Sequence, residues 1–308
     1  MWLRHFNSPY MGRISREKRL RLRAGPSNLR NLVSASPVNP KSRISRRFEQ
    51  LSSQGQTGFI AYVTAGDPPA EATLEVMRAL EEAGTDIIEL GVPFSDPLAD
   101  GPTIQAASGR ALAAGMTVLG VLELVRRFRD ESELPVVLFS YLNPIYTLGL
   151  PVFQKMAVEA GADGLLILDL PPEEALGLGA TEFADGPDLD PIRLIAPTTS
   201  PTRMEKVAAG GRGFIYYVSR EGVTGEQAEL SSGIGAQVAE LRRHTPLPIA
   251  VGFGISTPEQ SAAVARDADA VVVGSAIVRH IAENAAAKDL GARVRDFVHP
   301  LVLAARNA

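Results

Sequence analysis

Two acidic residues in the stretch DIIELGVPFSDPLADGPTIQ, residues 86–105, stand where acid/base chemistry is possible. The first, Glu89, interrupts an apolar run that is typical of a buried strand. Burying an ionised carboxylate without a partner costs free energy, and we expect no basic partner for Glu89. Apolar surroundings would raise the pKa of this carboxyl group towards neutrality, which suits proton transfer.

The second acid, Asp100, belongs to a turn-rich connection that also contains three prolines and a glycine. Loop residues held over the mouth of a rigid scaffold often bind or catalyse, so we interpret Asp100 as a functional residue. For Asp96, which precedes Pro97, a turn or capping role is equally well supported.

Glycines near the end of the chain predict an anion site. In VGFGIS (251–256) and VVVGSAI (271–277) an apolar strand pattern runs into a glycine-containing turn. Glycine lets a ligand approach the backbone closely, and the free amides at a helix N-terminus attract a phosphate group. The candidate phosphate ligands here are Gly254, Gly274 and Ser275.

Tyr216 ends another apolar run and is followed by a polar loop that contains Gly222 and Gly225. A loop of this composition at the active face is typical of a lid. Tyr216 is therefore a candidate active-site residue, although a core tyrosine with a locally satisfied hydroxyl is equally common.

Other chemistries find little support. The chain has no cysteine, so no disulfide or thiolate nucleophile is expected. The histidines are scattered without metal-ligand spacing, and we expect no metal site. Outside the N-terminal segment the lysines lie in helical or loop patterns, which argues against a Schiff base. Acid/base catalysis by carboxylates on a phosphorylated substrate remains.

The elements that must position these residues alternate along the chain from about residue 48. Helical spacing of apolar residues appears between short apolar runs, for example over 70–84 and 118–130. The runs that we interpret as strands are 58–63, 86–92, 135–140, 164–170, 192–197, 213–218, 247–253 and 270–274.

This alternation predicts an α/β fold with a single (β/α)8 TIM barrel over residues 45–308, which forms one catalytic domain. The active face of such a barrel lies at the C-terminal ends of its strands, where the candidate residues fall. The alternative, an open doubly wound sheet, is less well supported because no dinucleotide fingerprint follows the first strand.

Charge is distributed unevenly over the 308 residues. The first 47 residues hold 12 of the 31 Lys and Arg residues but only one acid, Glu17. We expect residues 1–44 to form a flexible basic extension. A plastid or mitochondrial targeting segment and an incorrectly assigned start codon are alternatives. A nucleic-acid-binding arm is less well supported because no aromatic residues are interleaved with the charges. No apolar stretch approaches the length of a membrane span.

Several motifs together resemble the tryptophan synthase alpha chain family: ELGVPFSDPLADGPTIQ, AYVTAGDP, YYVSREGVTG, GFGIS and GSAIV. The resemblance runs from about residue 45 onward, and the first motif is highly specific. It implies a TIM-barrel lyase, classed with the carbon–oxygen lyases, that cleaves indole-3-glycerol phosphate to indole and glyceraldehyde 3-phosphate. Indole then passes to a β subunit for the last step of L-tryptophan biosynthesis.

The resemblance also assigns roles to residues. Glu89 would protonate indole C3 and take the proton of the substrate hydroxyl, Asp100 would hold the indole N–H, and Tyr216 matches an active-site tyrosine. The indole pocket would draw on Tyr62, Thr64, Phe139 and Tyr141. The phosphate contacts would be Gly225, Gly254, Gly274 and Ser275. Segments 94–102 and 219–230 match mobile loops.

The same resemblance implies no cofactor in this chain, with pyridoxal phosphate in the β subunit, an α2β2 heterotetramer and a cytoplasmic location. A plastid location applies if residues 1–44 are a transit peptide. Segment 173–191 is unusually glycine-rich for the helix that the family has there. A free-standing lyase and a non-catalytic regulatory subunit remain alternatives, and a phosphate-binding barrel isomerase or epimerase is supported by the anion site alone.

Overall fold

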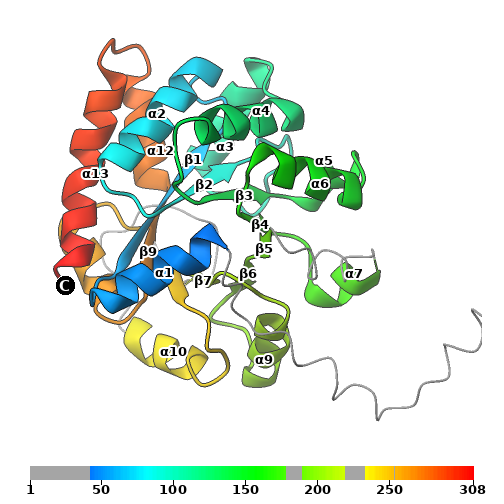
Figure 1. Cartoon of the computed structure of the whole chain (residues 1–308), viewed down its shortest axis with the longest axis vertical. Helices are drawn as coiled ribbons and strands as arrows, with labels where there is room; N and C mark the ends of the chain where they lie inside the picture. The colour runs from blue at the N-terminus through cyan, green and yellow to red at the C-terminus, as the bar shows by residue number, and fades with distance from the viewer. Residues whose placement is uncertain (1–41, 178–188, 219–232, 253) are drawn as a thin grey trace, which may run out of the picture. The chain divides into compact units, whose positions relative to one another are not determined.

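The computed structural model describes residues 42–177, 189–218, 233–252 and 254–308. Within these residues, nine parallel strands form one sheet in the order β5-β4-β3-β2-β1-β9-β8-β7-β6 (Figure 1). The strands are β1 (Gly58–Thr64), β2 (Ile87–Gly91), β3 (Val136–Ser140), β4 (Gly164–Ile167), β5 (Asp190–Pro191), β6 (Arg193–Ile195), β7 (Ile215–Val218), β8 (Ile249–Gly252) and β9 (Ala270–Val273).

The two edge strands of this sheet are two halves of one barrel strand. β5 pairs with β4, and β6 pairs with β7 on the other side. Between them, the amide of Ile192 donates to the carbonyl of Leu165 at 2.9 Å. The sheet therefore closes on itself through residues 190–195, and the predicted α/β barrel is confirmed.

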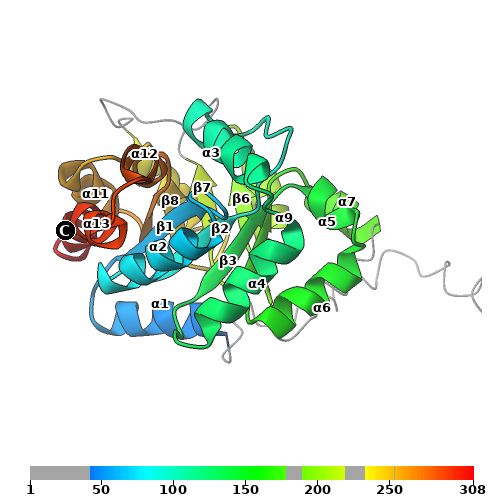
Figure 2. The ribbon, with the colours of Figure 1, turned by 90° about the horizontal axis from the view of Figure 1, so that it is seen from above.

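Helices surround the strands in both views (Figures 1 and 2). The predicted helices over 70–84 and 118–130 are observed as α2 and α4. The described helices are α1 (Arg43–Ser53), α2 (Ala70–Glu82), α3 (Pro102–Ala113), α4 (Val118–Arg129), α5 (Leu142–Tyr146), α6 (Leu150–Ala160), α7 (Pro172–Gly177), α9 (Pro201–Ala209), α10 (Ile234–Leu241), α11 (Pro258–Ala265), α12 (Ser275–Asn284) and α13 (Leu290–Arg306).

The strands bury both faces, as expected in a barrel covered by helices. Their outward side chains pack against the helices in one large cluster. Alternate side chains, such as Ile60, Ile87 and Val137, point inward and form a separate cluster. Ile44 and Phe48 of α1 join this inner cluster and so close the lumen at the N-terminal ends of the strands.

The floor of the barrel is tied together at Asp86, whose side chain is 1% exposed. One carboxylate oxygen accepts from the amide of Phe59 at 2.7 Å. The other accepts from Arg47 Nε of α1 at 2.8 Å and from Arg306 Nη2 of α13 at 3.0 Å. This carboxylate therefore joins β1, β2 and the first and last described helices.

Two expected features lie partly outside the described residues. The basic extension is one of them, since the description starts at Ser42 and α1 begins at Arg43, close to the expected start of the barrel domain. In the glycine-rich segment, α7 covers Pro172–Gly177 and residues 178–188 lie outside the description. No single helix in the described part of the chain is long and apolar enough to cross a membrane.

Replacing Asp86 by Asn should lower the free energy of unfolding by about 3–5 kcal/mol, because two guanidinium groups lose their shared buried counter-charge. Urea unfolding measures this change. The matched control is Asp289→Asn, which breaks an exposed pair with Arg293 and should leave the free energy of unfolding nearly unchanged. Equal losses in both variants would contradict the assigned role of Asp86.

Candidate active site

Glu89 lies in the middle of β2 with its side chain in the barrel lumen. It is 0% exposed, and neither carboxylate oxygen has a hydrogen-bond partner among the described residues. Burial raises the pKa of its carboxyl group from 4.5 to about 8, the direction predicted from the sequence. Arg193 is a basic residue within a strand, but its Nε donates to the carbonyl of Gly210, just beyond α9. At neutral pH Glu89 therefore holds a proton, and no described side chain forms a hydrogen bond with its carboxyl group.

Asp100 lies in the loop that follows β2, immediately before α3. Its carboxylate is buried and accepts a hydrogen bond from the Tyr141 hydroxyl at 3.1 Å. Burial raises the pKa of Asp100 to about 6, and the hydrogen bond from Tyr141 limits the rise. Asp100 is therefore mostly ionised at neutral pH, while Glu89 is mostly protonated. Two carboxyl groups with separated pKa values are suited to different roles.

The loop that carries Asp100 is fixed at several points. The amide of Ala99 donates to the Tyr141 hydroxyl at 3.0 Å, and Gln105 Nε2 donates to the Asp100 carbonyl at 2.8 Å. The ring of Phe94 lies 5.2 Å from that of Tyr141. Pro102 then begins α3, where a missing N–H costs no helical hydrogen bond. Tyr141 therefore both orients Asp100 and holds the loop in front of it.

Aromatic side chains line the lumen above Glu89. The rings of Tyr62 and Phe139 meet edge to face at 5.2 Å, and Phe139 lies 6.3 Å from Tyr216. The Tyr62 hydroxyl lies 3.5 Å from Thr64 Oγ1. Burial, then the charge of Asp100, raises the pKa of Tyr62, and burial, then the charge of Glu89, raises that of Tyr216. The structure thus brings the expected indole-pocket residues together with both acids.

Two strand-end glycines make room for the two tyrosines. A Cβ atom on Gly91 would lie 2.2 Å from the Tyr62 hydroxyl, and one on Gly252 would lie 2.3 Å from the Tyr216 hydroxyl. Each tyrosine therefore lies over the glycine of the next strand. Gly91 therefore leaves space on the Glu89 side of β2, and the Tyr62 ring occupies that space.

The candidate phosphate ligands lie after β8 and β9. Gly254 has a φ of 51°, a left-handed conformation that favours glycine. Gly274 is the N-cap of α12 with no side-chain cap, and Ser275 is the first residue of this helix. A Cβ on Gly274 would lie 3.4 Å from Tyr62 Cβ, which links this helix end to the aromatic lining. Gly225 and segment 219–230 lie outside the described residues.

Sequence reasoning missed the residues that cover the aromatic lining. Ile104 and Ala107 of α3 and Val278 of α12 pack with Tyr62 in a cluster of their own. Their signal, apolar residues at helical spacing, does not distinguish a helix over the barrel mouth from one on its outer wall. In the part of the chain that is described, no three His, Asp or Glu side chains are grouped to hold a metal ion.

A closed parallel barrel with one protonated and one ionised carboxyl group at its C-terminal face is typical of (β/α)8 enzymes that work by acid/base chemistry. A family model described as tryptophan synthase alpha chain matches residues 48–300. The chain belongs to the tryptophan synthase alpha chain family. The function that the resemblance predicted is thereby confirmed at the level of the family: an α subunit with lyase activity in tryptophan biosynthesis.

Individual relatives agree. The tryptophan synthase alpha chain of Citrifermentans bemidjiense is 53% identical over 240 residues, which cover 78% of this chain and 89% of the relative. That of Phenylobacterium zucineum is 49% identical, over 87% of this chain and 97% of the relative. The crystal structure of tryptophan synthase subunit alpha from Legionella pneumophila str. Paris is 41% identical, with a TM-score of 0.79, over 87% of this chain and 99% of that one. The family implies a β-subunit partner, and pyridoxal phosphate belongs to that partner, not to this chain.

Gly91→Ala should strain the site, because the new Cβ would lie 2.2 Å from the Tyr62 hydroxyl and 2.7 Å from its Cζ. We expect a loss of about 1–3 kcal/mol in the free energy of unfolding, the usual cost of overpacking. Tyr62→Leu removes the colliding atoms, so the double variant should be more stable than the sum of the single effects by about 1 kcal/mol. Urea unfolding of the four proteins measures this cycle, and strict additivity would contradict the contact.

Glu89 should make stability depend on pH. Its folded-state pKa of about 8 lies above the ordinary 4.5, so the folded state binds more protons than the unfolded state between these values. The free energy of unfolding should therefore fall as pH rises from 5 to 8, by a few kcal/mol (~1.4 per pH unit for one such group). Glu89→Gln should remove the fall between about pH 6 and 8 and leave the smaller fall below about pH 6 that the raised pKa of Asp100 causes, whereas Glu49→Gln, an exposed control, should retain both. Denaturant titrations at several pH values measure the free energy of unfolding of the three proteins. The same dependence of this free energy on pH in all three would argue against a protonated Glu89.

Proposed function

We propose that this chain cleaves indole-3-glycerol phosphate to indole and glyceraldehyde 3-phosphate by a retro-aldol step within an α2β2 heterotetramer in the cytoplasm. The observation that supports the reaction is the pair of carboxyl groups: Glu89 has its pKa raised to about 8 by burial, and Asp100 has its pKa raised only to about 6. This step breaks a carbon–carbon bond and is the aldolase-type half reaction of tryptophan synthase, which as a whole is classed with the carbon–oxygen lyases.

The proposed step needs one acid, one base and one hydrogen-bond acceptor. Protonated Glu89 gives its proton to C3 of the indole ring, and the positive charge that develops on the ring nitrogen is stabilised by ionised Asp100 at the N–H. The bond between C3 and the side chain then breaks, and its electron pair returns to the ring. The side-chain hydroxyl loses its proton to Glu89 and becomes the aldehyde carbonyl. Glu89 ends protonated, so the step balances.

The remaining site residues would position the substrate. Tyr62, Thr64, Phe139 and Tyr141 would enclose the indole ring, and Tyr216 would lie beside the bond that breaks. The amide groups around Gly254, Gly274 and Ser275 would bind the phosphate, since the uncapped start of α12 presents free N–H groups. Gly225 would add a contact from the loop after β7. Binding at both ends would hold C3 over Glu89.

The test is cleavage of indole-3-glycerol phosphate by the purified chain, alone and with an added tryptophan synthase β subunit. The measured quantities are the amounts of indole and glyceraldehyde 3-phosphate that are released. We expect weak activity alone and a sharp rise with the β subunit. Glu89→Gln should lower kcat by about 10²–10⁴-fold, because the general acid is lost. The exposed control Glu49→Gln should leave kcat unchanged.

Each other outcome has a distinct meaning. Strong activity that is indifferent to the β subunit would identify a free-standing lyase and reject the coupled assembly. No cleavage under either condition, in a folded chain that still binds the β subunit, would reject catalysis in favour of a regulatory subunit. Undiminished activity of Glu89→Gln would reject the assigned role of that residue.

A further inference from the structure

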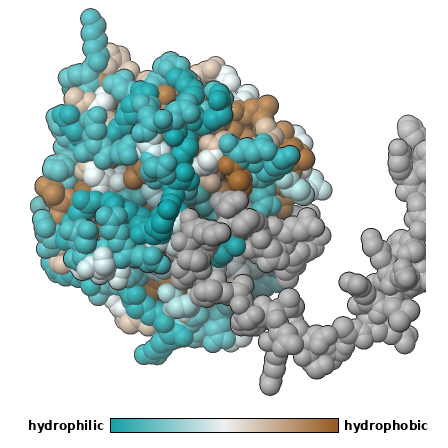
Figure 3. Space-filling model, in the orientation of Figure 1, coloured by the Kyte–Doolittle hydropathy of each residue, from teal (hydrophilic) through white to brown (hydrophobic). Residues whose placement is uncertain are grey.

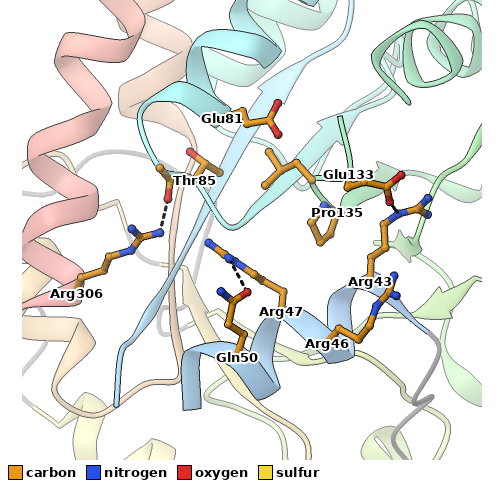
Figure 4. A pocket seen from close by; sticks show the side chains of 11 residues that line it. Arg43, Arg46, Arg47, Gln50, Glu81, Thr85, Glu133, Pro135 and Arg306 are labelled. Carbon is orange, nitrogen blue, oxygen red and sulfur yellow. Dashed lines mark hydrogen bonds and ion pairs between the residues drawn. The ribbon is translucent and has the colours of Figure 1, made fainter. Parts of the chain in front are cut away.

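A pocket of about 460 Å³ lies at the N-terminal end of the barrel, the end opposite the catalytic face (Figure 4). One side is formed by α1, where Arg43, Arg46 and Arg47 lie on one helical face. Arg306, in the last turn of α13, approaches from the other side, and the turn at Gly84 and Thr85 between α2 and β2 also lines the pocket. Its volume falls in the range of small-molecule sites.

Arginines outnumber the acids among the residues that line this pocket: four arginines stand against Glu81 and Glu133. Asp86 alone pairs with both Arg47 and Arg306, so one buried carboxylate serves two guanidinium groups. Arg46 is exposed, and its side chain forms no ion pair or hydrogen bond with any of the described side chains. Arg43 pairs with Glu133, whose side chain is 79% exposed, and an incoming anion can replace such a surface carboxylate at little cost. Arg43 also pairs with the buried Asp163 at 3.1 Å, a carboxylate that it shares with Arg129.

Two buried polar atoms at the pocket lack partners among the described residues. Thr85 is 2% exposed, and its hydroxyl oxygen makes no hydrogen bond. The Nε atom of Arg306 is likewise buried and unpaired, although its Nη2 atom is bonded to the Gly84 carbonyl and to Asp86. Buried hydroxyl and guanidinium groups normally have partners, so their lack of one at a pocket wall points to a ligand.

We propose that this pocket binds the phosphate group of a small molecule or free phosphate. Arginine recognises phosphate through paired N–H groups, and a hydroxyl such as that of Thr85 can donate to a further oxygen. Glu81, which also lines the pocket, accepts a hydrogen bond from Ser132 at 2.7 Å, so one of its two carboxylate oxygens is already occupied. The site lies at the far end of the barrel from Glu89 and is independent of the proposed cleavage reaction.

The experiment is amide hydrogen exchange of the full chain with and without millimolar pyrophosphate, with inorganic phosphate and a phosphate monoester such as glycerol phosphate as separate arms. Binding should slow exchange in α1 and around residues 84–86. This location separates the pocket from the phosphate ligands near Gly254 and Ser275. Stronger protection by the monoester than by inorganic phosphate would identify an organic phosphate as the ligand, and the reverse would identify free phosphate.

Arg46 provides the variants, because its replacement breaks no described ion pair. Arg46→Glu should weaken binding at the α1 face by about tenfold or more through charge repulsion, and Arg46→Gln should weaken it less. The matched control is Arg266→Gln, which removes an exposed arginine at the end of α11 and should leave binding unchanged. Protection confined to the catalytic face, or protection of α1 that survives Arg46→Glu in a folded chain, would overturn the proposal.

Discussion

The burial of one carboxyl group in the barrel lumen is the constraint on which the site depends. Glu89 has no partner among the described residues, so the protein keeps it neutral rather than paired. That condition needs a dry lumen, which the inner apolar cluster and the α1 residues beneath it provide. A hydrated or basic lumen would return Glu89 to an ordinary acid, unable to deliver a proton at neutral pH.

The pKa of the second acid, Asp100, is raised less than that of Glu89 because the two residues lie in different elements of the chain. Glu89 is held by a strand with both neighbours in register, whereas Asp100 is carried by a loop and meets a hydroxyl donor, Tyr141, from the segment after β3. Strand and loop thus give two similar side chains two different environments. Apolar residues of α3 and α12 pack over Tyr62 in the aromatic lining of the same site.

The sequence predicted the catalytic face from residues whose type is unusual for the segment that contains them. An acid inside an apolar run and glycines at strand ends both identify the catalytic face, and alternation of strands and helices identifies the barrel. Sequence reasoning did not find Ile104 and Val278 or the pairing of Tyr62 with Gly91, because these depend on which distant segments meet. Sequence reasoning also did not predict that the fifth barrel strand is divided into β5 and β6 at Ile192, because the composition of the residues around this position is continuous. The sequence also does not show that Arg47 and Arg306 share Asp86, because these residues meet only when the barrel closes.

Asp86 has a consequence for synthesis on the ribosome. Its two arginine partners come from opposite ends of the barrel sequence, and the contact with Arg306 spans 220 residues. A nascent chain can form the bond to Arg47 early, but the carboxylate reaches its full set of donors only when the last helix has left the exit tunnel. The floor of the barrel is therefore completed only once α13 has emerged, and chains truncated before Arg306 lack this last contact.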